Sequence, residues 1–203
     1  MGLGIQTTRL IGVALALLAL SCADSGGPVT VDAQWNLSCP TDGVVGCGAL
    51  APETCLGSVG QRAIVGEYRQ TACTGDPIVA SCDAVERPDG TLVVTLDADV
   101  GGEFAFKLDR ATVDISNGSV VQPSACNVTI IEDGLQYDIG ACGGEPPSIA
   151  QPCQLSSVSV QGRDISFDLQ CNSLLSSVTG LAFDVGAVGG GPTTIRFGNC
   201  TGL

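Results

Sequence analysis

The segment that decides the fold is "CNVTIIEDGLQYDI", residues 126–139. Apolar and polar side chains alternate on both sides of Asp133-Gly134, a dipeptide that favours the tight turn of a β-hairpin. A turn there places four apolar side chains on one face, pairing Ile130 with Tyr137 and Val128 with Ile139. The segment therefore predicts two antiparallel strands with one buried face.

Three further segments have the same alternation next to a turn signal or a neighbouring strand: residues 87–99, 103–116 and 156–169. In the last of these, "SSVSVQGRDISFDL", the turn is expected at Gly162-Arg163. Outside the N-terminal apolar run, no segment shows the apolar period of a helix. The pattern predicts an all-β fold, a disulfide-rich antiparallel β-sandwich or barrel built from hairpins, forming a single domain after a cleaved signal helix.

The chain contains an internal repeat, "GLQYDIGACGGEP" at 134–146 and "GLAFDVGAVGGGP" at 180–192. The similarity extends over residues 126–153 and 171–200, because each copy begins with Cys-Asn and closes with Cys. A duplicated strand and turn explains it, with the aromatic residue in the core and the Asp in water. The alternative is a ligand loop with Asp138 and Asp184 as equivalent acids. The structural interpretation is favoured because the copies differ at Glu145 and Gly191, where a shared site would be conserved between them.

Composition limits the class of protein. Hydrophobic residues make up 44% of the 203 residues and charged residues 14%, as expected for a folded chain rather than a disordered one. The formal charge is −13, and removal of a leader containing Arg9 leaves 7 basic and 21 acidic residues, a net −14. Nucleic acid is therefore an unfavourable partner.

The N-terminus has the pattern of an export signal. An apolar run from Leu10 to Leu20 follows Arg9 and is too short to span a bilayer, which takes about 20 residues. The stretch "LALSC" that ends at Cys22 resembles the lipobox of bacterial lipoproteins, and the resemblance covers residues 9–22. It implies cleavage before Cys22, a diacylglycerol thioether on that cysteine, and acylation of the new amino group by a chain such as palmitate.

The resemblance also implies a location and a domain division. Ala23, rather than Asp, follows the cysteine, which favours the outer membrane. We expect a signal peptide at 1–21, a lipidated Cys and flexible tether at 22–32, and a single β-rich domain at 33–203. The alternative is an ordinary secretory signal that leaves a soluble protein. In composition alone, the body resembles small Cys-rich envelope lipoproteins of gliding and predatory bacteria, which assigns no site residues.

The cysteines indicate disulfides. Setting Cys22 aside leaves an even number of the 11 cysteines, and none has the close spacing of a zinc site. The candidates are Cys39, Cys47, Cys55, Cys73, Cys82, Cys126, Cys142, Cys153, Cys171 and Cys200.

The sequence does not determine the connectivity of these ten cysteines, but the repeat and the hairpins suggest two schemes. Equivalent repeat copies would give Cys126–Cys153 and Cys171–Cys200. A hairpin scheme, preferred because its loops are shorter, gives Cys126–Cys142 and Cys153–Cys171, with Cys39–Cys200 joining the terminal strands. Both schemes allow the local bridges Cys47–Cys55 and Cys73–Cys82.

Several chemistries are disfavoured. The chain has no His, which excludes Ser-His-Asp and Cys-His mechanisms. Lys107 lies in the solvent phase of its strand, and "GNCTG" at 198–202 lacks a base beside a nucleophile. "DADVGGE" at 97–103 partly resembles a Ca²⁺ loop but has Leu108 where the last acid is expected. We therefore expect no catalytic residue, no metal site and no cofactor.

These observations together predict a lipid-anchored, non-enzymatic cell-envelope protein with a structural or binding role. It would be attached to the membrane through Cys22 and have an envelope protein or polymer as its partner. The alternatives are a soluble secreted module that binds or inhibits another protein and, less favoured, a hydrolase that uses paired carboxylates.

Overall fold

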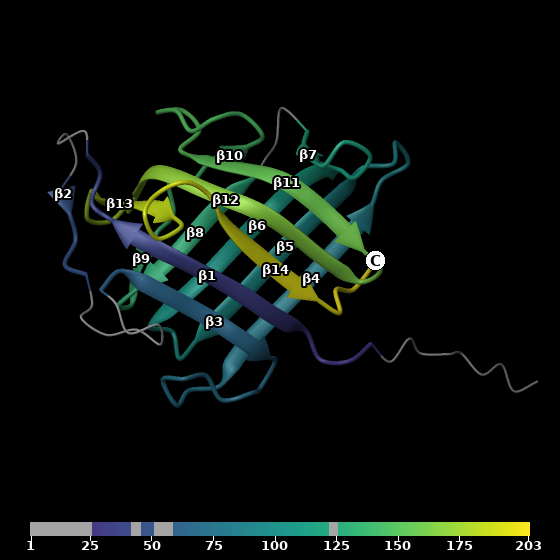
Figure 1. The fold of residues 1–203 in the computed structure, drawn as a ribbon, viewed down its shortest axis with the longest axis horizontal. Coiled ribbons are helices and arrows are strands. Elements are labelled where there is room, and N and C mark those ends of the chain that lie inside the picture. Colours follow the sequence, from purple (N-terminus) through teal and green to yellow (C-terminus); the bar gives the residue numbers. More distant parts are fainter. Residues whose placement is uncertain (1–25, 42–45, 51–58, 122–125) are drawn as a thin grey trace, which may run out of the picture.

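The computed structural model describes residues 26–41, 46–50, 59–121 and 126–203, which form two packed β-sheets (Figure 1). The larger sheet contains eight strands: β1 (Thr30–Ser38), β2 (Gly46–Cys47), β3 (Gln61–Glu67), β10 (Cys142–Gly143), β11 (Cys153–Gln161), β12 (Asp164–Leu175), β13 (Leu181–Gly186) and β14 (Thr193–Gly198). The smaller sheet contains six: β4 (Ile78–Glu86), β5 (Leu92–Val100), β6 (Phe104–Asp114), β7 (Ser119–Val120), β8 (Asn127–Glu132) and β9 (Leu135–Tyr137).

The all-β prediction is confirmed, and the architecture is that of a sandwich rather than a barrel. Most strand pairs are antiparallel, with parallel pairing between β10 and β11 and between β13 and β2. The predicted signal helix and Cys22 lie outside the described residues. Within the described ranges, the structure has no helix with the length and hydropathy needed to cross a bilayer.

The larger sheet has an unusual centre. Strand β12 pairs with β14 along residues 165–169 and with β13 along residues 171–175. Strand β1, on the other side, pairs with β14 at its N-terminal end and with β13 at its C-terminal end. Strands β13 and β14 therefore fill consecutive parts of the same position between β1 and β12. The residues that join them, 187–192, leave the sheet as a loop.

The core is built around Phe106 of β6, which is fully buried. Its ring centroid lies 6.3 Å from Trp35, 6.2 Å from Phe167 and 6.3 Å from Phe197, which belong to β1, β12 and β14 of the opposite sheet. Because one aromatic side chain of the smaller sheet contacts three strands of the larger one, it fixes how the two sheets face each other.

Two predictions for the hairpin at 126–139 are confirmed, the turn at Asp133-Gly134 and the strand pair nearest to it. Asp133 and Gly134 have φ values of 51° and 69°, and Ile130 is paired with Tyr137. The predicted pairing of Val128 with Ile139 is wrong, because the register shifts after Tyr137: the Val128 N–H donates to the Gly140 carbonyl at 2.7 Å, and Asn127 forms a bridge with Ala141. The backbone N–H groups of Asp138 and Ile139 donate to the carbonyl of Leu175 in the larger sheet, and the Ile139 side chain is 47% exposed.

The second hairpin, β11 with β12, has its turn at Gly162-Arg163 as predicted, with Val160 opposite Ile165. The register shifts between Ser156 and Ser159, and Ser157 has a φ of 53°. This irregularity is a β-bulge, which changes the strand direction by inserting an extra residue. Val158 nevertheless stays buried.

The folded domain begins earlier than the sequence suggested. Strand β1 starts at Thr30, inside the segment 22–32 that was expected to be a tether. Residues 30–33 pair with β14 on one side and with β3 on the other, and Val31 is buried. Even before the strand, the carbonyl of Val29 accepts a hydrogen bond of 2.8 Å from the Tyr68 N–H.

A buried ion pair connects the two sheets. Arg62 on β3 and Glu132 on β8 are each 3% exposed, and the guanidinium contacts both carboxylate oxygens. Arg62 also donates to the backbone carbonyl of Gln61 at 2.8 Å. Burial lowers the pKa of Arg62, with a partial opposing effect from the charge of Asp133.

Candidate functional site

The two hairpin disulfides predicted from sequence are confirmed. Cys126 bonds Cys142 and Cys153 bonds Cys171, with Cα–Cα distances of 5.1 and 4.0 Å. Cys153 and Cys171 are also register partners on β11 and β12. The alternative scheme of equivalent repeat copies, Cys126–Cys153 with Cys171–Cys200, is therefore wrong.

Three other predicted bridges are wrong. The observed disulfides Cys39–Cys47 and Cys82–Cys200 exclude Cys39–Cys200, Cys47–Cys55 and Cys73–Cys82. Strand β14 runs antiparallel to β1 with Gly198 opposite Thr30, which places Cys200 at the N-terminal end of β1. Cys39 follows the other end of that 9-residue strand, about 30 Å away. Cys73 is also disulfide-bonded, and Cys55 lies outside the described residues.

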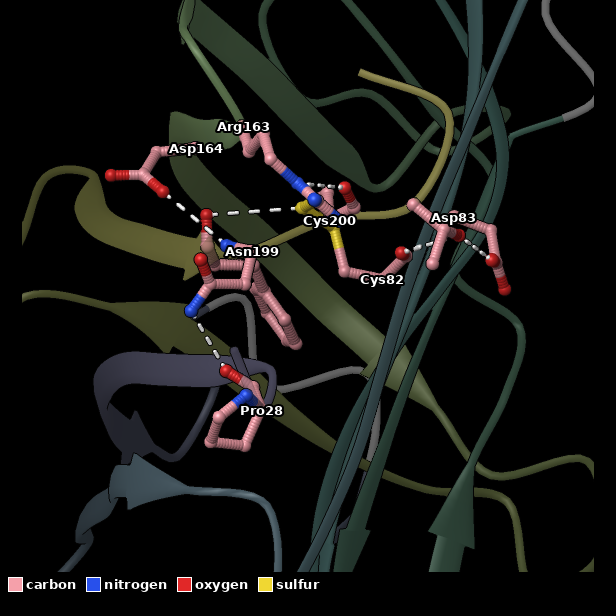
Figure 2. The surroundings of a disulfide bond; sticks show 9 residues. Pro28, Cys82, Asp83, Arg163, Asp164, Asn199 and Cys200 are labelled. Atoms are coloured by element: carbon pink, nitrogen blue, oxygen red, sulfur yellow. Dashed lines mark hydrogen bonds between the residues drawn. A yellow bond between two sulfur atoms is a disulfide. The ribbon is translucent and has the colours of Figure 1, made fainter. Parts of the chain in front are cut away.

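The Cys82–Cys200 bridge ties the chain terminus to the opposite sheet (Figure 2). Cys82 belongs to β4 of the smaller sheet, whereas Cys200 directly follows β14 of the larger one. The Thr201 N–H donates to the carbonyl of Cys82, and the Ala84 N–H donates to the carbonyl of Thr201, both at 2.9 Å. The segment "GNCTG" therefore covers part of the exposed edge of β4 and has a structural role.

The same region also holds the start of the domain. The Asn199 side-chain amide donates to the carbonyl of Pro28 at 2.8 Å, and the Arg163 Nε donates to the carbonyl of Cys200 at 3.3 Å (Figure 2). The Arg163 guanidinium lies against Gly26, where a side chain would overlap it. Both termini of the described fold are therefore packed at one end of the sandwich.

The carboxylates of the two acids in the repeat accept hydrogen bonds from the backbone. Asp138 accepts hydrogen bonds from the Ser177 N–H at 3.0 Å and hydroxyl at 2.8 Å, and Asp184 accepts from the Ser173 N–H at 2.8 Å. Asp184 thus holds the C-terminal part of β12, and Asp138 holds the turn that follows it. The preceding aromatic residues, Tyr137 and Phe183, pack against each other with centroids 4.9 Å apart.

The pKa of Asp138 reflects these contacts. Partial burial raises the pKa of the carboxyl, but the hydrogen bonds donated by Ser177 and Gln136 outweigh that effect, and the pKa lies below the ordinary 3.8. This side chain is therefore an ionised structural acceptor at neutral pH.

The segment 97–103 comprises the end of β5 and the short turn that leads to β6. Asp99 accepts a hydrogen bond from the Gly102 N–H at 2.9 Å, and Asp97 forms a 3.2 Å ion pair with Lys107 on the neighbouring strand. The side chain of Lys107 is partly exposed, as the alternation of its strand predicts. Across the part of the chain that the structure describes, no group of three or more His, Cys, Asp or Glu side chains is arranged to hold a metal ion.

The best candidate for a binding site is a hollow of about 310 Å³ on the outer face of the larger sheet. It opens where the 187–192 loop leaves the sheet between β1 and β12. Its polar walls are Asn36 and Ser38 of β1, Gln170 and Asn172 of β12 and Asp184 of β13. Glycines 189–191 of the loop line it as well, together with Cys171, Val185, Gly186 and Ala187.

The glycines give this hollow its shape. A side chain at Gly186 would overlap the carbonyl oxygen of Gly191, so that only glycine lets the loop return close to β13. Gly189, Gly190 and Gly191 have φ values of 89°, 95° and 82°, which side-chain-bearing residues rarely adopt. The sequence predicts the repeat's glycine motif as a turn, but its position above the hollow depends on how β13 and β14 succeed each other between β1 and β12.

No family model, curated protein or solved structure matches this chain. The site assignment therefore rests on the geometry of the fold and on the chemistry of its residues.

Proposed function

We propose that this chain is a lipid-anchored, non-enzymatic cell-envelope protein with a structural or binding role, attached through Cys22 to the outer membrane. The disulfides are compatible with an extracellular or envelope location, because thiols stay reduced in the cytoplasm. The binding role is assigned to the hollow beside the glycine loop.

The cysteine count is the observation that carries the anchor. All nine described cysteines are disulfide-bonded, and four bonds join eight of them to one another. The chain has 11 cysteines, an odd number, and the two outside the described residues are Cys22 and Cys55. One of these two is left over for another role, and Cys22 lies in the lipobox-like stretch. Peptide mapping is expected to find Cys73 joined to Cys55.

The packed N-terminus supports a short link to the membrane. The fold holds the chain from Gly26 through contacts with Arg163 and Asn199. A chain advances at most about 3.6 Å per residue, which puts Gly26 within roughly 14 Å of a lipidated Cys22. The end of the sandwich that holds Gly26 and Cys200 would therefore lie beside the bilayer.

Side-chain chemistry supports a non-enzymatic role. The chain lacks His, its one Lys is paired with Asp97, and the repeat acids Asp138 and Asp184 accept backbone hydrogen bonds. A nucleophile beside a general base is the usual sign of covalent catalysis. The Ser177 hydroxyl does donate to Asp138, but the same carboxylate also accepts the Ser177 N–H, so this contact orders the backbone after β12.

Membrane fractionation of the Cys22→Ser variant tests the anchor. We expect the wild-type protein in the outer-membrane fraction and the variant in the soluble fraction, because two or three acyl chains are needed for stable attachment. Ser25→Ala is the matched control and should stay with the membrane. A wild-type protein found soluble in the medium would overturn the anchor and favour a secreted binding module.

A further inference from the structure

Four polar side chains that line the hollow beside the glycine loop have no hydrogen-bond partner among the described residues. The amides of Asn36, Gln170 and Asn172 and the hydroxyl of Ser38 line it and make no hydrogen bond with any other described residue. Each amide offers both a donor and an acceptor, and the hydroxyl offers both as well. Four such groups around one hollow match a ligand that is itself rich in hydroxyl groups.

The charge of the hollow narrows the ligand class. Among the described residues that line it there is no Lys or Arg, and the one carboxylate, Asp184, already holds the Ser173 N–H through one oxygen. An anionic ligand would find no cation there and would be repelled by a chain of net charge −13. A neutral ligand fits best.

The polar character continues along the sheet. The outward-facing side chains of β1 and β12 alternate with the buried core residues and form two rows, Asp32, Gln34, Asn36 and Ser38 on β1 and Ser166, Asp168, Gln170 and Asn172 on β12. Between the rows, Thr194 of β14 donates to Asp168 at 2.7 Å. The hollow is thus one end of a longer polar surface of amides and hydroxyls, which away from the hollow also carries Asp32, Asp168 and, between the rows, Arg196.

The outer face of the smaller sheet is different. Strand β4 exposes Val79 and Val85, which are 53% and 63% accessible, and β5 presents Asp97. The collection of unpaired amides is therefore a property of the larger sheet, and Ser81 on β4 provides a matched position away from it.

We propose that the hollow and the adjoining face of β1 and β12 bind a neutral glycan, with a sugar residue in the hollow and its neighbours along the two rows. The amides and Ser38 would donate to and accept from sugar hydroxyls, and the backbone of the glycine loop would approach the ligand closely because no side chains intervene. This inference names a ligand for the proposed binding role but does not depend on the lipid anchor.

Binding of the full-length protein, purified in detergent, to immobilised neutral oligosaccharides tests the proposal. The panel would contain gluco-, manno-, galacto- and N-acetylglucosamine oligosaccharides, with sulfated and uronic-acid glycans for comparison. We expect at least one neutral glycan to bind, and we expect Gln170→Ala and Asn172→Ala each to weaken that binding about fivefold, since each removes one or two hydrogen bonds.

The controls separate binding from folding and from the anchor. Ser38→Ala should weaken binding, whereas Ser81→Ala on the other sheet should not, and all four variants should keep the wild-type unfolding temperature. Cys22→Ser should bind the glycan as well as the wild type does, even if it leaves the membrane. Binding to none of the neutral glycans, binding to charged glycans alone, or full binding by Gln170→Ala and Asn172→Ala would each overturn the proposal.

Discussion

At the scale of single residues, the ion pair of Arg62 and Glu132 is the feature with the largest energetic consequence. Each charge is 3% exposed, and each neutralises the other across the space between the sheets. Replacing Arg62 by Met alone leaves a buried carboxylate without its partner, and we expect a loss of about 3–5 kcal/mol in the free energy of unfolding. Urea denaturation with the disulfides intact measures this loss.

The double variant R62M/E132M is the matching control. Without either charge, the desolvation cost disappears, and the free energy of unfolding should return to within about 1–2 kcal/mol of the wild type. Equal losses of unfolding free energy in the single and double variants would show that the packing of these two side chains matters more than the pairing of their charges.

Asp138 gives a pH-dependent prediction. Its pKa is lower in the folded protein than its ordinary 3.8. The stability that it contributes is therefore fully present above about pH 4 and is lost as the pH falls through the folded pKa. In Asp138→Asn this contribution is absent. We therefore expect the unfolding temperature of the variant to fall less than that of the wild type between about pH 5 and about pH 2. Identical acid profiles for the two proteins would contradict the assignment.

At the scale of elements, the sequence predicts which side chains of a strand face the core, but it does not predict where each strand ends. The alternation at 92–96 and 165–169 predicts the residues that the structure buries. The same rule places Arg62 in phase with Ile64, and Glu132 in phase with Ile130, so that the buried charges had a sequence signal. Ile139 departs from the prediction because Leu175, distant in the chain, supplies its hydrogen-bond partner.

The β8–β9 turn provides a test at this scale. Gly134 has a φ of 69°, and no atom lies within 4 Å of a side chain built there, which makes the cost of Gly134→Ala purely conformational. We expect a loss of about 1 kcal/mol, measured by chemical denaturation. The control is Gly144→Ala, where the nearest atom lies at an ordinary 3.4 Å and φ is not positive, and it should change stability little.

At the scale of the whole molecule, the disulfides show how far local reasoning extends. The bridges within neighbouring hairpins, Cys126–Cys142 and Cys153–Cys171, follow from short loops of 16 and 18 residues. Cys82–Cys200 spans 118 residues and depends on how the two sheets stack, which no local pattern specifies. The candidate site could not be predicted from local sequence either, because the hollow forms only where β13 ends and β14 begins between β1 and β12.

The long bridge should stabilise the fold more than a short one. In the chain-entropy description, a closed loop of about 100 residues contributes about 4.7 kcal/mol and one of about 15 residues about 3 kcal/mol. The paired change C82A/C200A should therefore cost about 1–2 kcal/mol more than C126A/C142A in the free energy of unfolding. An equal or smaller cost would indicate that residues 198–202 are held against β4 by their backbone hydrogen bonds instead.

The anchored, disulfide-closed domain is tested most directly by the intact mass of the protein extracted from its native membrane, before and after reduction. We expect the mass of residues 22–203 plus acyl chains, with a gain of two hydrogens for each disulfide on reduction and no free thiol beforehand. An unlipidated mass, or a thiol that alkylates at Cys22 without reduction, would contradict the lipid anchor.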